Sequence, residues 1–330
     1  MTGIFEKFNS LNILIIGDVM MDSYVWGKIE RVSPEAPVPV VQVTKKENRL
    51  GGAANVALNV QSLGARPIIC AVIGDDQEGA ELINLLDRSN LSNDGIIIIK
   101  GRPTTVKTRI IAHNQHIVRV DSETDTIIPE DSNRLVQEKI AEIISARKID
   151  AIIFEDYDKG LISEELITFT VTLANQKGII TVVDPKKRSF DFYRDVSLFK
   201  PNLKELREGL KLEIDPVSTT ELATAVDLIK SKLNAKSVML TLSEHGVFLS
   251  TANDQRLIPA HVRTIADVSG AGDTVVATAA LCLAAGLDEY QTAAISNLAG
   301  GLVCEHVGVV PIDKNRLLLE CNELLVSGGQ

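Results

Sequence analysis

Short apolar runs rich in β-branched residues alternate with longer stretches of helical periodicity along most of the chain. The apolar runs, which predict strands, cover residues 13–16, 68–73, 151–154, 179–183 and 238–242. The helical stretches cover residues 53–63, 80–88, 131–146, 164–176 and 220–233, and each is long enough to serve as a crossover connection. This alternation predicts an α/β fold with a doubly wound, largely parallel sheet in a three-layer sandwich.

Two further strand-like stretches, residues 38–44 and 104–121, interrupt that rhythm. The second has a polar tip at residues 113–116 that indicates a hairpin, and neither stretch is followed at once by a predicted crossover helix. We expect a small β-lid, from about residues 23–48 and 103–122, inserted into a single domain that spans residues 1–330. An edge extension of the main sheet explains the same pattern equally well.

The charge balance restricts the ligands that the surface can attract. Lys and Arg number 34 and Asp and Glu number 44, which gives a net charge of −10 with neutral His. This disfavours a broad surface for nucleic acid or for an anionic membrane. An anionic ligand would therefore need a local site.

The cysteines and the apolar segments indicate the cellular compartment in which the protein resides. The four cysteines are widely spaced and form no CxxC pair, which is typical of reduced thiols in the cytoplasm. The first residues lack the apolar segment of a signal peptide, and no apolar run reaches the roughly 18 residues that a membrane helix needs. We expect a soluble cytoplasmic protein.

Polar residues follow most of the predicted strands. In a doubly wound sheet, ligands bind beyond the carboxyl ends of the strands, so these residues are candidates for chemistry. Each of them taken alone is more often a turn residue or a helix N-cap. The residues are Asp18, Asp75, Asp76, Glu155, Asp156, Asp184, Ser243 and Glu244.

The strongest local motif is the glycine-rich segment from Asp267 to Thr274, which leads into the apolar helical stretch 275–285. Glycines allow close approach of a ligand to the backbone, and the start of a helix presents free N–H groups that bind phosphate. Asp273 falls in the first turn of that helix, where a carboxylate could accept a proton from an attacking hydroxyl. A turn that is merely capped by Asp273 is an equally good interpretation of the spacing alone.

A second glycine-rich segment, from Gly51 to Ala57, also opens a predicted helix. Asn55 in its first turn can both donate and accept hydrogen bonds, which suits sugar hydroxyls. Neither glycine-rich segment ends in the Gly-Lys-Ser/Thr of a P-loop, and neither matches the dinucleotide fingerprint.

Three signatures occur together in order: Gly51 to Asn55, Asn202-Leu203-Lys204-Glu205, and Asp267 to Asp273. With them the chain resembles the PfkB/ribokinase family of carbohydrate kinases over nearly its whole length. The resemblance implies a ribokinase-like fold and the use of ATP and Mg²⁺, and in this family a monovalent cation such as K⁺ can also take part.

The resemblance also implies roles for individual residues. Asp273 would be the general base, and the amides around Gly270, Ala271 and Gly272 would bind the transferred phosphoryl group. The residues implied on the ATP side are Asn202, Glu205, Ser243, Gly246 and Asn297, with Glu205 acting on Mg²⁺ indirectly. On the sugar side they are Asp18, Gly51, Gly52, Asn55 and Asp184.

Other segments are similar to the kinase module of the ADP-heptose pathway enzymes. The most discriminating is the stretch from Arg31 to Val40, which contains Ser-Pro-Glu-Ala-Pro-Val-Pro. This similarity implies phosphorylation of C1 of D-glycero-β-D-manno-heptose 7-phosphate for lipopolysaccharide core synthesis. We further expect a homodimer formed through the β-lid and, because the chain ends at Gln330, a separate nucleotidylyltransferase downstream.

The phosphate already present on such a substrate needs cationic partners. Arg109, and Lys159 in its glycine-flanked loop, are our preferred candidates. A two-residue turn at residues 114–115 would put Arg109 and Arg119 on opposite faces of the hairpin unless a bulge intervenes. Asp158 departs from the expected pattern, because it adds a carboxylate beside Lys159.

Three other functions remain open at this stage. The chain could phosphorylate a different sugar or sugar phosphate, or it could be a nucleotide- or sugar-binding regulator without turnover. A dehydrogenase that uses NAD is the third, although its dinucleotide fingerprint is missing.

Overall fold

The computed structural model describes residues 1–113 and 115–327, and the side chains of these residues up to residue 323. Its main sheet has nine strands in the order β13-β12-β11-β10-β9-β8-β1-β4-β5. The strands are β1 (Asn12–Gly17), β4 (Arg66–Gly74), β5 (Ile96–Ile99), β8 (Ala151–Glu155), β9 (Ile180–Asp184), β10 (Leu198–Phe199), β11 (Ser237–Thr241), β12 (Val247–Ser250) and β13 (Gln255–Ile258). All neighbours from β5 to β11 pair in parallel, and β12 and β13 add an antiparallel edge.

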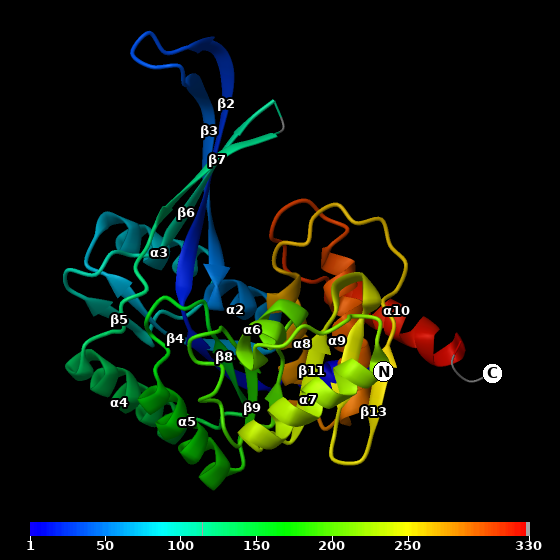
Figure 1. Ribbon diagram of the computed structural model, residues 1–330. Helices are drawn as coiled ribbons and strands as arrows, with labels where there is room; N and C mark the ends of the chain where they lie inside the picture. Colours follow the sequence, from blue (N-terminus) through cyan, green and yellow to red (C-terminus); the bar gives the residue numbers. More distant parts are fainter. Residues whose placement is uncertain (114, 328–330) are drawn as a thin grey trace.

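Helices cover both faces of this sheet (Figure 1). They are α1 (Thr2–Phe8), α2 (Ala53–Ser62), α3 (Gln77–Arg88), α4 (Glu130–Ala146), α5 (Glu164–Lys177), α6 (Leu203–Leu210), α7 (Thr219–Leu233), α8 (Ala271–Ala284), α9 (Glu289–Val303) and α10 (Lys314–Ser327). Side chains alternate across a strand, so Ile13 and Ile15 of β1 pack in one hydrophobic cluster while Leu14 and Ile16 pack in the other. The predicted three-layer α/β sandwich is therefore confirmed.

The predicted strands of the main sheet and the predicted helices all occur, with shifts of a few residues at their ends. The largest shift is in α8, which begins at Ala271, four residues before the expected start. Gly270 adopts a left-handed φ of 79° there, and this residue starts the helix inside the glycine-rich segment itself.

A second sheet of four strands, in the order β3-β2-β6-β7, projects from the body (Figure 1). Its strands are β2 (Val19–Val32), β3 (Pro39–Gly52), β6 (Val106–Ala112) and β7 (Gln115–Ser122). We call this sheet the lid. The strand expected at residues 38–44 is longer than predicted, and the expectation that no helix follows it directly is wrong. Strand β3 runs into α2, because Gly52 has a φ of 59° and turns the chain between them.

The register of the β6–β7 hairpin pairs Arg109 directly with Arg119. Directly paired residues share a face, so the two arginines lie on the same side of the lid rather than on opposite sides. The cause is the bulge that the sequence left open, which shifts the register between Ile110 and Ile111. Of the expected turn at residues 114–115, residue 114 lies outside the described part of the chain.

Within the described residues, no helix has both the length and the apolar character that a bilayer crossing requires.

Candidate active site

The N-terminus of α8 forms the centre of the site. From Thr274 to Cys282 this helix is buried, and its small and apolar side chains fit it tightly between α2, α9 and the sheet. Gly272 in its first turn is exposed, whereas the Ala271 N–H donates to the Val268 carbonyl oxygen over 3.3 Å. The first N–H groups of a helix have no intrahelical partner and carry partial positive charge, which makes this end a binding place for an anion.

Asp273 lies buried in the same turn, with both carboxylate oxygens hydrogen-bonded. Asn55 Nδ2 of α2 donates to Oδ2 over 2.6 Å, and the Tyr157 hydroxyl donates to Oδ1 over 2.9 Å. Burial raises the pKa of Asp273 to about 6, although these two hydrogen bonds oppose the rise. The carboxylate is thus mostly ionised at neutral pH, yet basic enough to accept a proton.

Two further buried acids and a buried lysine lie next to this turn. Asp184, at the end of β9, pairs with Lys200 over 2.9 Å, and a Cβ placed on Gly272 would be 3.5 Å from the Asp184 carboxylate. Glu155 ends the neighbouring strand β8, where burial and then the charges of Asp184 and Asp273 raise its pKa. Its Oε2 has no hydrogen-bond partner within the described residues, which suits a site completed by a ligand.

The Asn202-Leu203-Lys204-Glu205 motif begins α6 with a reciprocal capping box. The Glu205 N–H donates to Asn202 Oδ1, and the Asn202 N–H donates to Glu205 Oε2, both over 2.9 Å. The second Glu205 oxygen accepts from Lys186 Nζ over 2.5 Å. Burial opposes the charge of Lys186, but Asp184 and Glu205 outweigh it and raise the pKa of that amine. Lys186 is therefore a fixed cation between the strand ends and α6.

Asp18 fixes the loop that carries Tyr157. Its carboxylate accepts N–H bonds from Tyr157 and Lys159 at 3.0 Å each, and from Leu161 at 3.4 Å. Burial, followed by the charge of Asp156, raises the pKa of Asp18 to about 6. The side chain is 3% exposed, so its main visible role is to hold this loop beneath the lid.

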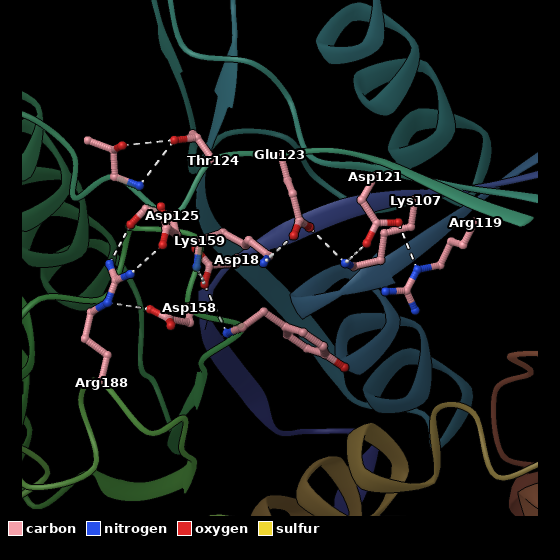
Figure 2. A network of polar contacts seen from close by, with 12 residues as sticks. Asp18, Lys107, Arg119, Asp121, Glu123, Thr124, Asp125, Asp158, Lys159 and Arg188 are labelled. Atoms are coloured by element: carbon pink, nitrogen blue, oxygen red, sulfur yellow. Dashed lines mark hydrogen bonds and ion pairs between the residues drawn. The ribbon is translucent and has the colours of Figure 1, made fainter.

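The Lys159 side chain enters a chain of ion pairs that links this loop to the lid (Figure 2). Glu123 accepts from Lys159 over 2.9 Å and from Lys107 over 2.8 Å. At the other end of the loop, Arg188 pairs with Asp158 over 2.8 Å. The unexpected Asp158 carboxylate is thus neutralised by Arg188, away from the Lys159 amine.

Gly51 and Gly52 connect the lid to α2. A Cβ on Gly51 would lie 2.5 Å from an Asp22 carboxylate oxygen, and one on Gly52 would overlap the carbonyl oxygen of Asp18. Asp22 in turn accepts a hydrogen bond from Arg109. The two glycines therefore allow the base of the lid to approach the start of α2 closely.

Three of the expected nucleotide-side residues lie in the segment between β11 and β12 and on α9. Ser243 is exposed in a short 3₁₀ turn (Ser243–His245) after β11, and Gly246 follows it with a φ of 91° against the backbone of Ile258. Asn297 of α9 donates to the carbonyl oxygen of Pro259 over 2.9 Å. Gly246 and Asn297 thus meet the same segment after β13.

Other strand-end residues have the structural roles that their types favour. Asp76 is the N-cap of α3 and accepts the Gly79 N–H over 2.7 Å. Asp156 is buried and accepts from the Ser189 and Tyr193 hydroxyls.

Sequence reasoning missed Tyr157, Lys200 and Arg49. Tyr157 directly follows the Glu155-Asp156 pair and Lys200 precedes the Asn202 motif by two residues, so proximity to known motifs was the available signal. Arg49 lies near the end of β3, just after the charged stretch from Lys45 to Glu47, and gives no such signal.

Comparisons with known proteins identify related sequences. Residues 10–315 match the model of the "pfkB family carbohydrate kinase". The chain is 39% identical over 311 residues to "Bifunctional protein HldE" of Helicobacter pylori and 38% identical over 312 residues to the protein of that name from Magnetococcus marinus. Each alignment covers 94% of this chain, which spans 66% and 64% of those relatives.

Solved structures share the fold at low sequence identity. Phosphofructokinase-2 from Escherichia coli in complex with potassium matches with a TM-score of 0.78 and 18% identity, over 96% of this chain and 99% of its own. Arabidopsis thaliana ribokinase complexed with ribose and ATP matches with a TM-score of 0.71 and 16% identity, over 94% of this chain and 98% of its own.

Proposed function

Because the chain belongs to the pfkB family of carbohydrate kinases, we propose that it phosphorylates the C1 hydroxyl of D-glycero-β-D-manno-heptose 7-phosphate with ATP. The products are the 1,7-bisphosphate and ADP. The observation that carries the catalytic part is the buried Asp273 at the open N-terminus of α8.

In this mechanism the C1 oxygen attacks the γ-phosphorus in line, and the bond from that phosphorus to the bridging oxygen of ADP breaks. Asp273 accepts the proton of the hydroxyl, as its pKa of about 6 allows. The N–H groups of Gly270, Ala271 and Gly272 stabilise negative charge on the transferred group. Asn55 orients the carboxylate, and its buried Oδ1, which has no partner among the described residues, can accept from a sugar hydroxyl.

On the nucleotide side we assign Asn202, Glu205, Ser243, Gly246 and Asn297 to ATP. The fixed cation Lys186 beside Glu205 supports this assignment, because an ammonium group there can approach the phosphates. The N-terminus of α6 would then form one side of the binding site for the ATP phosphates.

Mg²⁺ fits as an ion carried by the nucleotide. The described residues contain no cluster of three acidic, His or Cys ligands. Mg²⁺ commonly keeps several waters and binds through one or two carboxylates and the substrate phosphates. Glu205 would act on it indirectly, and when bound the ion supplies charge neutralisation on the phosphates.

A monovalent cation such as K⁺, as the family resemblance implies, would be attracted by the negative charge of Asp267. Burial opposes ionisation of this side chain, but N–H groups of Ser269 and Gly308 outweigh it and hold its pKa below the ordinary value. The result is a fixed negative charge three residues before Gly270.

The heptose assignment rests on the segment from Arg31 to Val40 and on the similarity to the bifunctional relatives. Arg109 and Lys159 remain our candidates for the 7-phosphate, with Asp18, Gly51, Gly52 and Asp184 shaping the sugar side. We also propose a cytoplasmic location, which the use of ATP and four buried free thiols support. The nucleotidylyltransferase step expected downstream would belong to a different module.

The lid supports a homodimer. Its face opposite Arg109 carries β-branched side chains, and Val43, Val118 and Val120 are 47%, 48% and 53% exposed. Exposed apolar sheet faces of this kind are typical of protein interfaces, and a second lid offers a matching surface.

A panel of acceptors tests the substrate assignment. Steady-state phosphorylation by ATP would be compared for the heptose 7-phosphate, fructose 6-phosphate, fructose 1-phosphate and ribose. We expect the highest kcat/KM for the heptose. A higher value for another sugar would replace the substrate, and ligand binding without any turnover would support a regulator instead.

A further inference from the structure

Two arginines on the inner face of the lid lie against the same aromatic ring. The guanidinium carbon of Arg49 is 4.9 Å from the ring centroid of Tyr24, and that of Arg109 is 5.4 Å from it. Tyr24 is buried, which gives the two cations a rigid platform. Arg49 comes from β3 and Arg109 from β6, so three strands converge at this point.

Each of the two guanidinium groups is held by one carboxylate and still has N–H donors without a partner among the described residues. Glu47 accepts from Arg49 Nε over 2.6 Å, and Asp22 accepts from Arg109 Nη1. Within the described residues, the terminal nitrogens of Arg49 and the Nη2 of Arg109 have no hydrogen-bond partner. A planar guanidinium fixed in this way can bind a phosphate through two parallel hydrogen bonds.

The Lys159 amine is less accessible to a phosphate ligand than the Arg49 guanidinium group. It is 16% exposed at its side chain and shares Glu123 with Lys107, so its charge is already compensated by a nearby carboxylate (Figure 2). Arg49 is 34% exposed at its side chain. Glu47 accepts from its Nε and also from Lys45 over 2.6 Å, so the terminal nitrogens of Arg49 stay free for a ligand within the described residues.

Arg49 is also connected to the reaction centre through one short segment. A Cβ on Gly308 would lie 3.0 Å from Arg49 Nη1, and a Cβ on Gly270 would lie 3.1 Å from Asn55 Nδ2 and 3.2 Å from the neighbouring Val309. The segment 308–309 thus borders Arg49 at Gly308 and, at Val309, borders Gly270, the residue that precedes the first turn of α8 with Asp273.

We propose that Arg49 and Arg109, held on Tyr24, bind the phosphate group already present on the sugar and so select phosphorylated over unphosphorylated acceptors. This inference rests on the proposed function and adds Arg49 and Tyr24 to it as determinants of specificity.

The test compares Arg49→Gln with wild type on a sugar phosphate and on the same sugar without its phosphate. Loss of a charged hydrogen bond predicts a fall of about tenfold or more in kcat/KM for the phosphorylated sugar, mostly through KM. The kcat/KM for the unphosphorylated sugar and the KM for ATP should change less than about twofold. Arg49→Lys should recover only part of the loss, because the ammonium group lacks the fork.

Arg88→Gln on α3 is the matched control, because Arg88 is 71% exposed and pairs only loosely with Glu81 at 3.8 Å. Equal loss on both acceptors, or no loss on either, would overturn the proposal. If the heptose is inactive but fructose 6-phosphate reacts, the heptose assignment fails. The effect of Arg49→Gln on the ratio of kcat/KM for fructose 6-phosphate to that for fructose then tests whether the arginines bind the phosphate. Turnover restricted to unphosphorylated sugars would refute the arginine pair directly.

Discussion

Asp273 and Asn55 are 218 residues apart in the chain and 2.6 Å apart in the site. Each lies in a glycine-rich helix start that the sequence makes visible. Their contact depends on the packing of α2 against α8, which no local pattern reports. The sequence could therefore indicate both candidate residues, but not that the Asn55 amide would orient the Asp273 carboxylate.

Replacement of Asp273 by Asn should lower kcat by about a hundredfold or more, the usual contribution of a positioned base. The amide keeps the shape of the side chain, so the KM for ATP should change little. Steady-state kinetics on the purified variant measures both values. A kcat close to that of wild type would remove Asp273 from the role of base.

The same residue predicts a pH dependence. The base works as a carboxylate, so kcat/KM should fall as the pH drops through about 6. In Tyr157→Phe a hydrogen bond that lowers the pKa of Asp273 is lost, and the acidic limb should move to higher pH by about half a unit or more. Tyr290→Phe, at an exposed tyrosine of α9, should leave the profile in place. An unshifted limb in Tyr157→Phe would contradict the assigned contact.

At the level of elements, Asn202 at the start of α6 has both a structural role and a proposed functional role. The sequence motif predicted a nucleotide contact for Asn202, and its capping of α6 is the role that its residue type alone favours. Both are compatible, because the cap fixes the start of α6 and the position of Glu205 beside Lys186.

Asn202→Ala should therefore cost about 1 kcal/mol of stability through the lost cap and also raise the KM for ATP about threefold or more. Ser218→Ala is the matched control, since Ser218 caps α7 by accepting the Glu221 N–H. It should lose similar stability without any change in KM. Denaturant unfolding and ATP kinetics separate the two effects, and equal KM values in both variants would leave Asn202 a structural cap only.

For the whole molecule, periodicity was enough to predict the α/β sandwich, because each strand supplies side chains to two cores. It was not enough for the lid, where long antiparallel strands with mixed polar and apolar positions leave both faces partly exposed. The direction of Arg109 and Arg119 depended on one bulged residue, which sequence patterns rarely reveal.

The exposed apolar face of the lid predicts the state of association. Val120→Lys places a charge on that face and should convert a dimer to a monomer in light scattering. Val217→Lys, at a valine 66% exposed in the loop before α7, should leave the dimer intact. A wild-type protein that is monomeric at working concentration would remove the proposed pairing of lids.

The most direct measurement of the central claim is phosphorus NMR of the product formed from ATP and D-glycero-β-D-manno-heptose 7-phosphate. The account predicts a new phosphate signal on C1 alongside the retained signal on C7, formed together with ADP and absent with Asp273→Asn. A phosphate on any other carbon, or ADP formed without a sugar bisphosphate, would contradict it.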